Sequence, residues 1–191
     1  YVDNFMNNSY NGAKKAVGSI YVQNISSENE IFNSSRSYKK GAIVLHMLRG
    51  IVGDDKFFQI LKEYLNEPGL SYNVATTEDF QRIAERVYGQ SLDYFFKEWI
   101  YGENYPKYTV GTNIKQLADG SYQITFRLKQ NVNTNPSFFT MPVKIRITLL
   151  DVIINRTLFN NEQDQGWVIN LGKTAPTKIE FDPDNWILKD I

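Results

Sequence analysis

One tyrosine of this sequence stands in a setting that could support chemistry. Tyr38 is followed by Lys39, Lys40 and Gly41, and then by the apolar residues 42–45. This is an unusual helix start, because positive charge is disfavoured in the first turn and glycine costs about 1 kcal/mol relative to alanine. Gly41 would let another backbone approach closely, and the phenol could donate a hydrogen bond to a developing oxyanion. Alternatively Tyr38 is an aromatic plug at the helix start, which the pattern by itself favours.

The other candidate groups are better explained as parts of the fold. His46 is the only histidine, and a metal site needs several convergent ligands, so we expect it to be a packed helix residue. Three acidic pairs could be imagined as catalytic carboxylates, namely Asp54 with Asp55, Glu78 with Asp79, and Asp182 with Asp184. The first two pairs lie at predicted helix starts, where acids are favoured, and the third lies in a turn.

Composition limits the classes of protein to consider. The chain has 191 residues, enough for two small domains, and its 21 basic residues equal its 21 acidic ones. Nothing therefore indicates a nucleic-acid or polybasic membrane partner. Without cysteine, disulfides and thiolate metal sites are excluded, and the apolar runs are too short for a membrane span. Because the chain begins with Tyr rather than Met, we expect a piece of a longer protein.

Helical periodicity dominates the first half of the chain. We expect a buried helix over 38–52, since its apolar residues cover nearly the whole circumference. Gly53 should end it, and Asp54 should cap the next helix. Thr76 or Thr77 should cap a third helix and Ser91 a fourth. Residues 1–30 carry only weak patterns, and we expect residues 1–103 to form an all-helical segment.

After residues 102–107 the period changes to strict alternation. Apolar residues recur at every second position over six or seven short segments, as in antiparallel strands with one buried face. Asp119-Gly120 is a hairpin turn signal. We expect residues 106–191 to form an antiparallel β-sandwich, so that the whole chain is an α+β protein of two domains.

Residues 31–106, taken together, resemble one region of the aminopeptidase N-like zinc metallopeptidases, the gluzincin aminopeptidases. The shared elements are a Y-x-K-G start on a GAxVLxML helix, then LGD..F...L..Y, T..DF, G..L..FF..W and GxP.Y patterns. The matching residues are Tyr38, Lys40, Gly41, Leu45, Leu48, Gly53, Asp54, Phe57, Tyr64, Thr77, Asp79, Phe80, Gly89, Leu92, Phe95, Phe96, Trp99 and Pro106. The segments FTMPVKIRI and FDPDNWILKD resemble the sandwich that follows the catalytic domain in many members.

The resemblance implies a fold and a role for Tyr38. It implies that residues 1–103 are the C-terminal part of a thermolysin-like catalytic domain, followed by an immunoglobulin-like β-sandwich. It also implies a zinc aminopeptidase that removes N-terminal residues from peptides. In that family the counterpart of Tyr38 hydrogen-bonds the tetrahedral intermediate as zinc-bound water attacks the peptide carbonyl. The helix would then begin as it does because its first residue points into an active site.

The same resemblance exposes missing parts. The family's H-E-x-x-H motif, its glutamate ligand on the next helix and its G-x-M-E-N loop are absent from this sequence. We therefore expect zinc in the full-length parent and none on this chain, which should be inactive alone. The implied partners are a peptide substrate and the upstream catalytic half of the same polypeptide. Without that half, the exposed helical face could mediate self-association.

Two alternatives stay open. The chain could belong to a degenerate peptidase homologue that acts as a non-enzymatic protein- or carbohydrate-binding module. Alternatively the parent could keep the zinc site but act as an endopeptidase or an epoxide hydrolase. An intact or eroded H-E-x-x-H motif upstream would decide the first question, and the amine-anchoring loop would decide the second.

Overall fold

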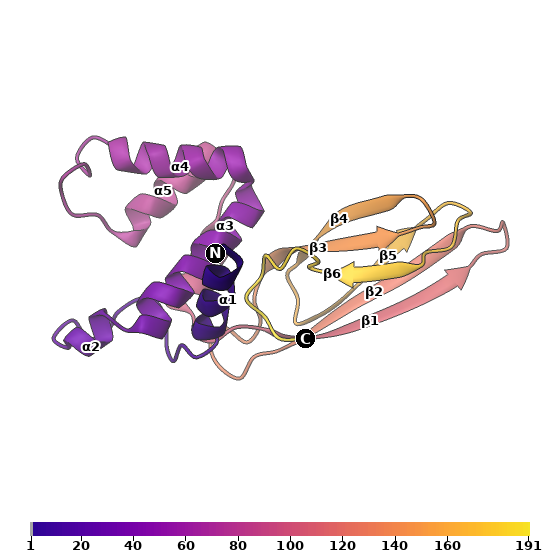
Figure 1. The fold of residues 1–191 in the computed structure, drawn as a ribbon, viewed down its shortest axis with the longest axis horizontal. Coiled ribbons are helices and arrows are strands. Elements are labelled where there is room, and N and C mark those ends of the chain that lie inside the picture. Colours follow the sequence, from indigo (N-terminus) through magenta and orange to yellow (C-terminus); the bar gives the residue numbers. More distant parts are fainter. Residues whose placement is uncertain (1) are drawn as a thin grey trace. The chain divides into compact units, whose positions relative to one another are not determined.

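The computed structural model describes residues 2–191, and the chain divides into two compact units, Tyr1–Glu103 and Asn104–Ile191 (Figure 1). The first unit is helical and the second consists of antiparallel strands. The predicted α+β class, helices followed by a β-sandwich, is confirmed.

The helical unit begins with an element that the sequence marked only weakly. Its helices are α1 (Val2–Ala13), α2 (Glu28–Ile31), the π-helix η1 (Ser34–Lys40), α3 (Gly41–Val52), α4 (Asp54–Asn66), α5 (Thr77–Tyr88), α6 (Asp93–Phe96) and the π-helix η2 (Lys97–Tyr101). Helix α1 packs against η1 and α3, and α4 packs against both α3 and α5.

The stretch around Tyr38 differs from the single helix predicted over 38–52. It consists of η1 and α3, joined at Gly41. The backbone N–H of Gly41 donates to the carbonyl of Arg36, five residues back, and to that of Tyr38, three residues back. A π-type turn of this kind is wider than an α-helical turn and occurs often at functional sites. The apolar period that indicates an α-helix starts only after Lys40, which is why the sequence did not reveal the change.

Helix ends follow the predicted signals in part. Gly53 ends α3 with a φ of 83°, a conformation that suits glycine. Asp54 does not cap α4, because it already lies in the helix and its carboxylate accepts hydrogen bonds from Arg49 at 2.8 Å. Thr76 caps α5 in a capping box with Asp79, as one of the two predicted choices.

The fourth predicted helix is divided and starts later than expected. Leu92 holds the position before α6, while the hydroxyl of Ser91 accepts the N–H of Asp93 at 3.2 Å. The helix then widens into η2, where Trp99 is fully buried. Aromatic side chains from α4, α5 and α6 meet in edge-on contacts, Tyr64 with Phe80 and Phe80 with Phe96. These rings form part of the helical core.

The second unit is a sandwich of two three-stranded antiparallel sheets. One sheet has the order β1-β2-β5 and the other β4-β3-β6. Their strands are β1 (Lys107–Gln116), β2 (Tyr122–Asn131), β3 (Met141–Thr148), β4 (Ile153–Asn160), β5 (Asp164–Asn170) and β6 (Lys178–Phe181). The β1–β2 hairpin turns at Gly120, with a φ of 82°, where the Asp-Gly signal predicted a turn.

Alternate residues of the central strands build the core of the sandwich. The buried side chains are Ile124, Phe126 and Leu128 of β2 and Val143, Ile145 and Ile147 of β3. The sheets meet through aromatic rings, since Phe126 of one sheet lies 6.4 Å from Phe181 of the other, centre to centre. This alternation, predicted from the period of two, is what gives each sheet one buried face.

Candidate functional site

Tyr38 projects from η1 rather than filling a gap in the core. Its side chain is 58% exposed, whereas Lys40, two residues later, is 1% exposed. An aromatic plug would be enclosed by its neighbours, and within the described chain Tyr38 is not. The structure therefore places the phenol of Tyr38 at the surface. Lys40, on the same turn, is buried in the helical core.

The start of η1 is fixed by hydrogen bonds from the preceding segment. The side chain of Asn33 accepts the backbone N–H of Arg36 at 2.9 Å. The guanidinium of Arg36 donates to the carbonyl oxygen of Glu30 at 2.6 Å and to its carboxylate at 2.7 Å. The hydroxyl of Ser37 donates to the carbonyl of Ile31 at 2.8 Å. Together these bonds anchor the turn on the amino-terminal side of Tyr38.

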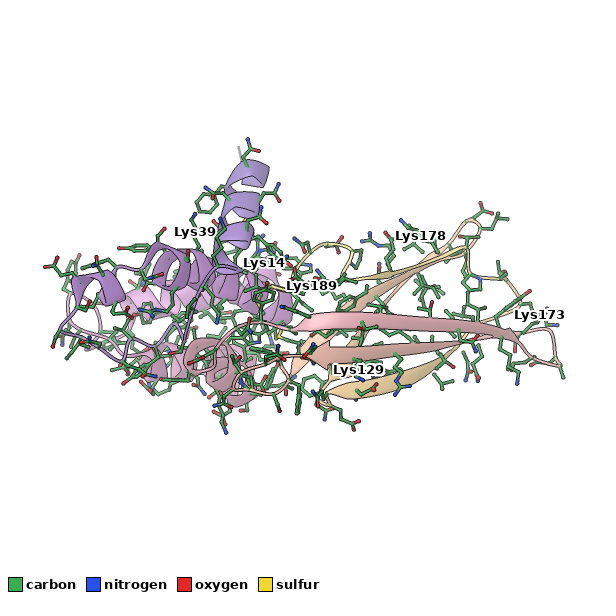
Figure 2. The ribbon with its side chains drawn as sticks, turned by 90° about the horizontal axis from the view of Figure 1, so that it is seen from below. Lys14, Lys39, Lys129, Lys173, Lys178 and Lys189 are labelled. Atoms are coloured by element: carbon green, nitrogen blue, oxygen red, sulfur yellow. The ribbon has the colours of Figure 1, made fainter. Side chains whose placement is uncertain are left out.

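Lys39 ties the same turn to helix α1 (Figure 2). Its Nζ donates to the side-chain oxygen of Asn8 at 3.2 Å. Its aliphatic stem lies across Gly12 so closely that a Cβ added there would fall 2.0 Å from the Lys39 Cδ. Glycine at position 12 therefore leaves the space that the Lys39 side chain occupies.

Lys40 is held differently, because it is buried. Its Nζ has no hydrogen-bond partner within the described residues. Burial lowers the pKa of Lys40 to about 8, and the nearby charge of Glu103 acts in the opposite direction. The lowering shows that desolvation outweighs the attraction of the carboxylate. At neutral pH the side chain is still largely an ammonium ion inside the helical unit.

An apolar cleft of about 290 Å³ opens along α3, starting three residues after Tyr38. Its lining includes Gly41, Leu45 and Leu48 from α3 and Phe80 from α5. A Cβ added at Gly41 would meet no described atom within 4 Å, so the expected close approach of another backbone does not occur among the described residues. The glycine instead keeps this end of the cleft open, and Leu45, 39% exposed, lies in its wall.

Asp54, Glu78 and Asp79 have structural partners. Arg49 binds Asp54, and Asp79 belongs to the capping box of α5. The hydroxyl of Tyr101 donates to Glu78 at 2.5 Å, which lowers the pKa of Glu78.

The pair in the closing turn is structural as well. The buried carboxylate of Asp182 accepts the backbone N–H groups of Trp186 and Ile187 and the Nζ of Lys189, the last at 2.6 Å. Asp184 accepts a hydrogen bond from Arg146 at 2.9 Å. All of these contacts stabilise turns and helix starts, as the sequence indicated.

The chain does not supply a metal centre of its own among the side chains that the structure describes, those of residues 4–191. The His, Asp and Glu side chains of this part form no group of three that could hold a metal ion. His46 lies in α3 and is the only histidine of the sequence, so no second imidazole is available as a metal ligand. The described residues therefore do not fit the zinc site that a zinc peptidase requires. In the same part of the chain, no helix has both the length and the apolar character to cross a bilayer.

Two features of the site escaped the sequence. The burial of Lys40 had no signal, since lysines at helix starts are normally solvated. Gly12 had none either, because a glycine in a segment rich in asparagine looks like a turn residue. The Y-x-K-G pattern includes Lys40, but it gives no reason why a lysine is needed at this position.

Known proteins resemble the chain in both sequence and fold. The Peptidase family M1 domain matches residues 2–99. Human aminopeptidase N is 27% identical over 177 residues, which cover 83% of this chain and 18% of that protein. Probable aminopeptidase 2 of Sulfurisphaera tokodaii is 35% identical over 95 residues, which cover 50% of this chain and 12% of the relative.

A solved structure agrees in fold. The crystal structure of Legionella pneumophila aminopeptidase A in complex with aspartic acid matches 94% of this chain with a TM-score of 0.75 and 15% identity. The chain spans 20% of that protein and a similar or smaller share of the two relatives above. With half of the sequence matched by the domain and the helical and β parts in the same order, the chain belongs to peptidase family M1, as its Y-x-K-G region predicted.

Proposed function

We propose that the chain is part of a longer zinc aminopeptidase that removes N-terminal residues from peptides. In this proposal the helical unit completes the catalytic domain and the sandwich follows it. Membership of family M1 and the aminopeptidase names of the relatives support the reaction class. The observation that carries the role of this chain is the exposed phenol of Tyr38 on an otherwise anchored turn.

Tyr38 is the residue of this chain that takes part in the reaction, as a hydrogen-bond donor. Its hydroxyl donates to the oxyanion that forms when the peptide carbonyl becomes tetrahedral. Such a donor is effective when it is fixed before the charge appears, because no reorganisation is then needed during the reaction. The bonds made by Arg36 and Ser37, and the contact of Lys39 with α1, supply that fixation.

The metal site and the rest of the active site belong to other parts of the polypeptide in this proposal. The described residues do not form a zinc site, so no step is assigned to a metal on this chain. The chain alone should be inactive, and its catalytic partner is the upstream half of the same polypeptide. The substrate is a peptide with a free amino end.

Replacing Tyr38 by Phe in the longer polypeptide tests the role of the hydroxyl. The donor acts on charge that exists only in the transition state, so kcat should fall while KM changes little. Losing one oxyanion donor typically lowers kcat about 10²–10³-fold. Steady-state hydrolysis of an aminoacyl reporter substrate measures the change, and an N-acetylated reporter should not be cleaved.

Tyr72→Phe is the matched control, because Tyr72 is also an exposed tyrosine of the helical unit but lies in the loop after α4. It should leave kcat and KM unchanged. If Tyr38→Phe were as silent as this control, Tyr38 would have no part in catalysis. A longer polypeptide whose H-E-x-x-H motif is eroded would instead favour the non-enzymatic binding module.

A further inference from the structure

The buried amine of Lys40 is not explained by the role proposed for Tyr38. Its side chain is 1% exposed, and its Nζ forms no hydrogen bond to any described residue. Each of these features costs stability. An unbranched apolar side chain of similar length would fill the same volume without that cost, so folding alone does not account for a lysine here.

The negative charge of Glu103 attracts the buried amine of Lys40. Its carboxylate is the charged group whose attraction partly offsets the burial of Lys40. Glu103 belongs to the same compact unit, and its backbone forms a β-bridge with Ser19. The carboxylate is therefore attached to a defined part of the helical unit. An ammonium ion is attracted toward that point, whereas an apolar side chain has no such preference.

The backbone couples Lys40 to Tyr38. The bond from the N–H of Gly41 to the carbonyl of Tyr38 closes a short turn that contains Lys40. On this turn the Lys40 side chain enters the core and the Tyr38 side chain faces outward. A change in the anchoring of Lys40 is transmitted to Tyr38 through only two peptide units.

We propose that Lys40 is a positioning residue for Tyr38, because its buried side chain anchors the short turn that carries Tyr38. The inference rests on the proposed function, in which the Tyr38 hydroxyl meets a developing oxyanion. Lys40 itself touches no reacting atom. A buried charge that lowers stability but favours one conformation is a recognised use of such groups. Precision matters here, because a displacement of about 1 Å can lower a catalytic rate by about 10²-fold.

Replacing Lys40 by Met in the longer polypeptide separates positioning from folding. Methionine keeps the unbranched shape and removes the charge. We expect kcat for the aminoacyl reporter to fall about 10-fold with KM within about twofold, while the midpoint of thermal unfolding stays equal or rises. Glu103→Gln should lower kcat in the same sense and add little to the loss in Lys40→Met.

Lys62→Met is the matched control, since Lys62 is an exposed lysine of α4 and lies outside the turn that carries Tyr38. Its kcat should stay within about twofold of the parent. A positioning residue acts through Tyr38, so Lys40→Met should cause no further loss in a Tyr38→Phe background.

Each remaining outcome has a definite meaning. Additive losses in the double variant, or a fall in thermal stability with a proportional loss of active enzyme, would overturn the inference in favour of another or a purely structural role. A silent Lys40→Met beside an impaired Tyr38→Phe overturns the inference alone. A silent Tyr38→Phe overturns the proposed function, and the inference with it.

Discussion

Lys40 carries a measurable signature in the pH dependence of stability. Its pKa is about 8 in the folded chain against an ordinary value of 10.5. Between these values the unfolded state binds the proton more tightly than the folded state, so stability rises as pH increases through this range. Tyr94 and Tyr105, whose pKa values are raised to about 12 by burial, act in the opposite direction above about pH 10.

We therefore predict a gain in stability between about pH 7 and about pH 9.5 that depends on Lys40. Denaturant unfolding of the parent and of Lys40→Met at both pH values gives the difference. The advantage of Lys40→Met over the parent should shrink as pH rises, because the parent then loses its buried charge. A difference independent of pH would mean that Lys40 titrates normally.

At the scale of single residues, the sequence indicated which side chain could take part in a reaction. It did not indicate how exposed that side chain is or what surrounds it. Tyr38 stood out because a phenol, two lysines and a glycine together begin an apolar helix. Its exposure could not be read from that pattern, which by itself favoured a packed ring. The carboxylate that attracts Lys40 belongs to Glu103, and the Lys39 side chain rests on Gly12. Both residues are distant in the sequence, and no local rule connects them to the two lysines.

Among the helices, the cap of α5 allows a direct test of a predicted element. The Thr76 hydroxyl accepts the backbone N–H of Asp79, and the Asp79 carboxylate accepts that of Thr76. Thr76→Ala should lower the free energy of unfolding by about 1 kcal/mol, because one N–H of the first turn loses its acceptor. Thr76→Ser keeps an acceptor and should retain most of the stability. Equal losses in both variants would show that the cap contributes nothing.

Elements with a strong period or a clear stop were predictable, and elements set by tertiary contacts were not. The alternation of β2 and β3 and the stop at Gly53 follow from local residue types. The two π-helices are not, since the wide turn at η1 depends on Asn33, Glu30 and α1. Asp54 illustrates the competition, because a good capping residue was instead engaged by Arg49.

At the scale of the whole chain, metal content is the simplest test. A catalytic zinc normally needs three protein ligands, and this sequence has one histidine and no cysteine. Purified chain should therefore contain much less than one equivalent of zinc after dialysis, by atomic emission. One tightly bound zinc per chain, together with peptidase activity, would contradict the idea that the metal site lies elsewhere in the polypeptide.

The cleft along α3 predicts how the isolated chain behaves in solution. Its apolar lining is open to water at Leu45, and exposed apolar surface of this kind favours association. We expect concentration-dependent self-association in sedimentation experiments. Leu45→Asp should weaken it, whereas Leu150→Asp, in the loop after β3 of the other unit, should not. A chain that stays monomeric at high concentration would argue against this surface.

The contact between Gly12 and Lys39 has a practical consequence for anyone who trims the chain. In the sequence, α1 looks dispensable, and a boundary drawn just before Asn33 would preserve the entire Y-x-K-G signature. Such trimming would remove Asn8 and Gly12, and with them the surface on which the Lys39 side chain rests. The shortened chain would keep the signature but lose part of the support that holds its tyrosine in place.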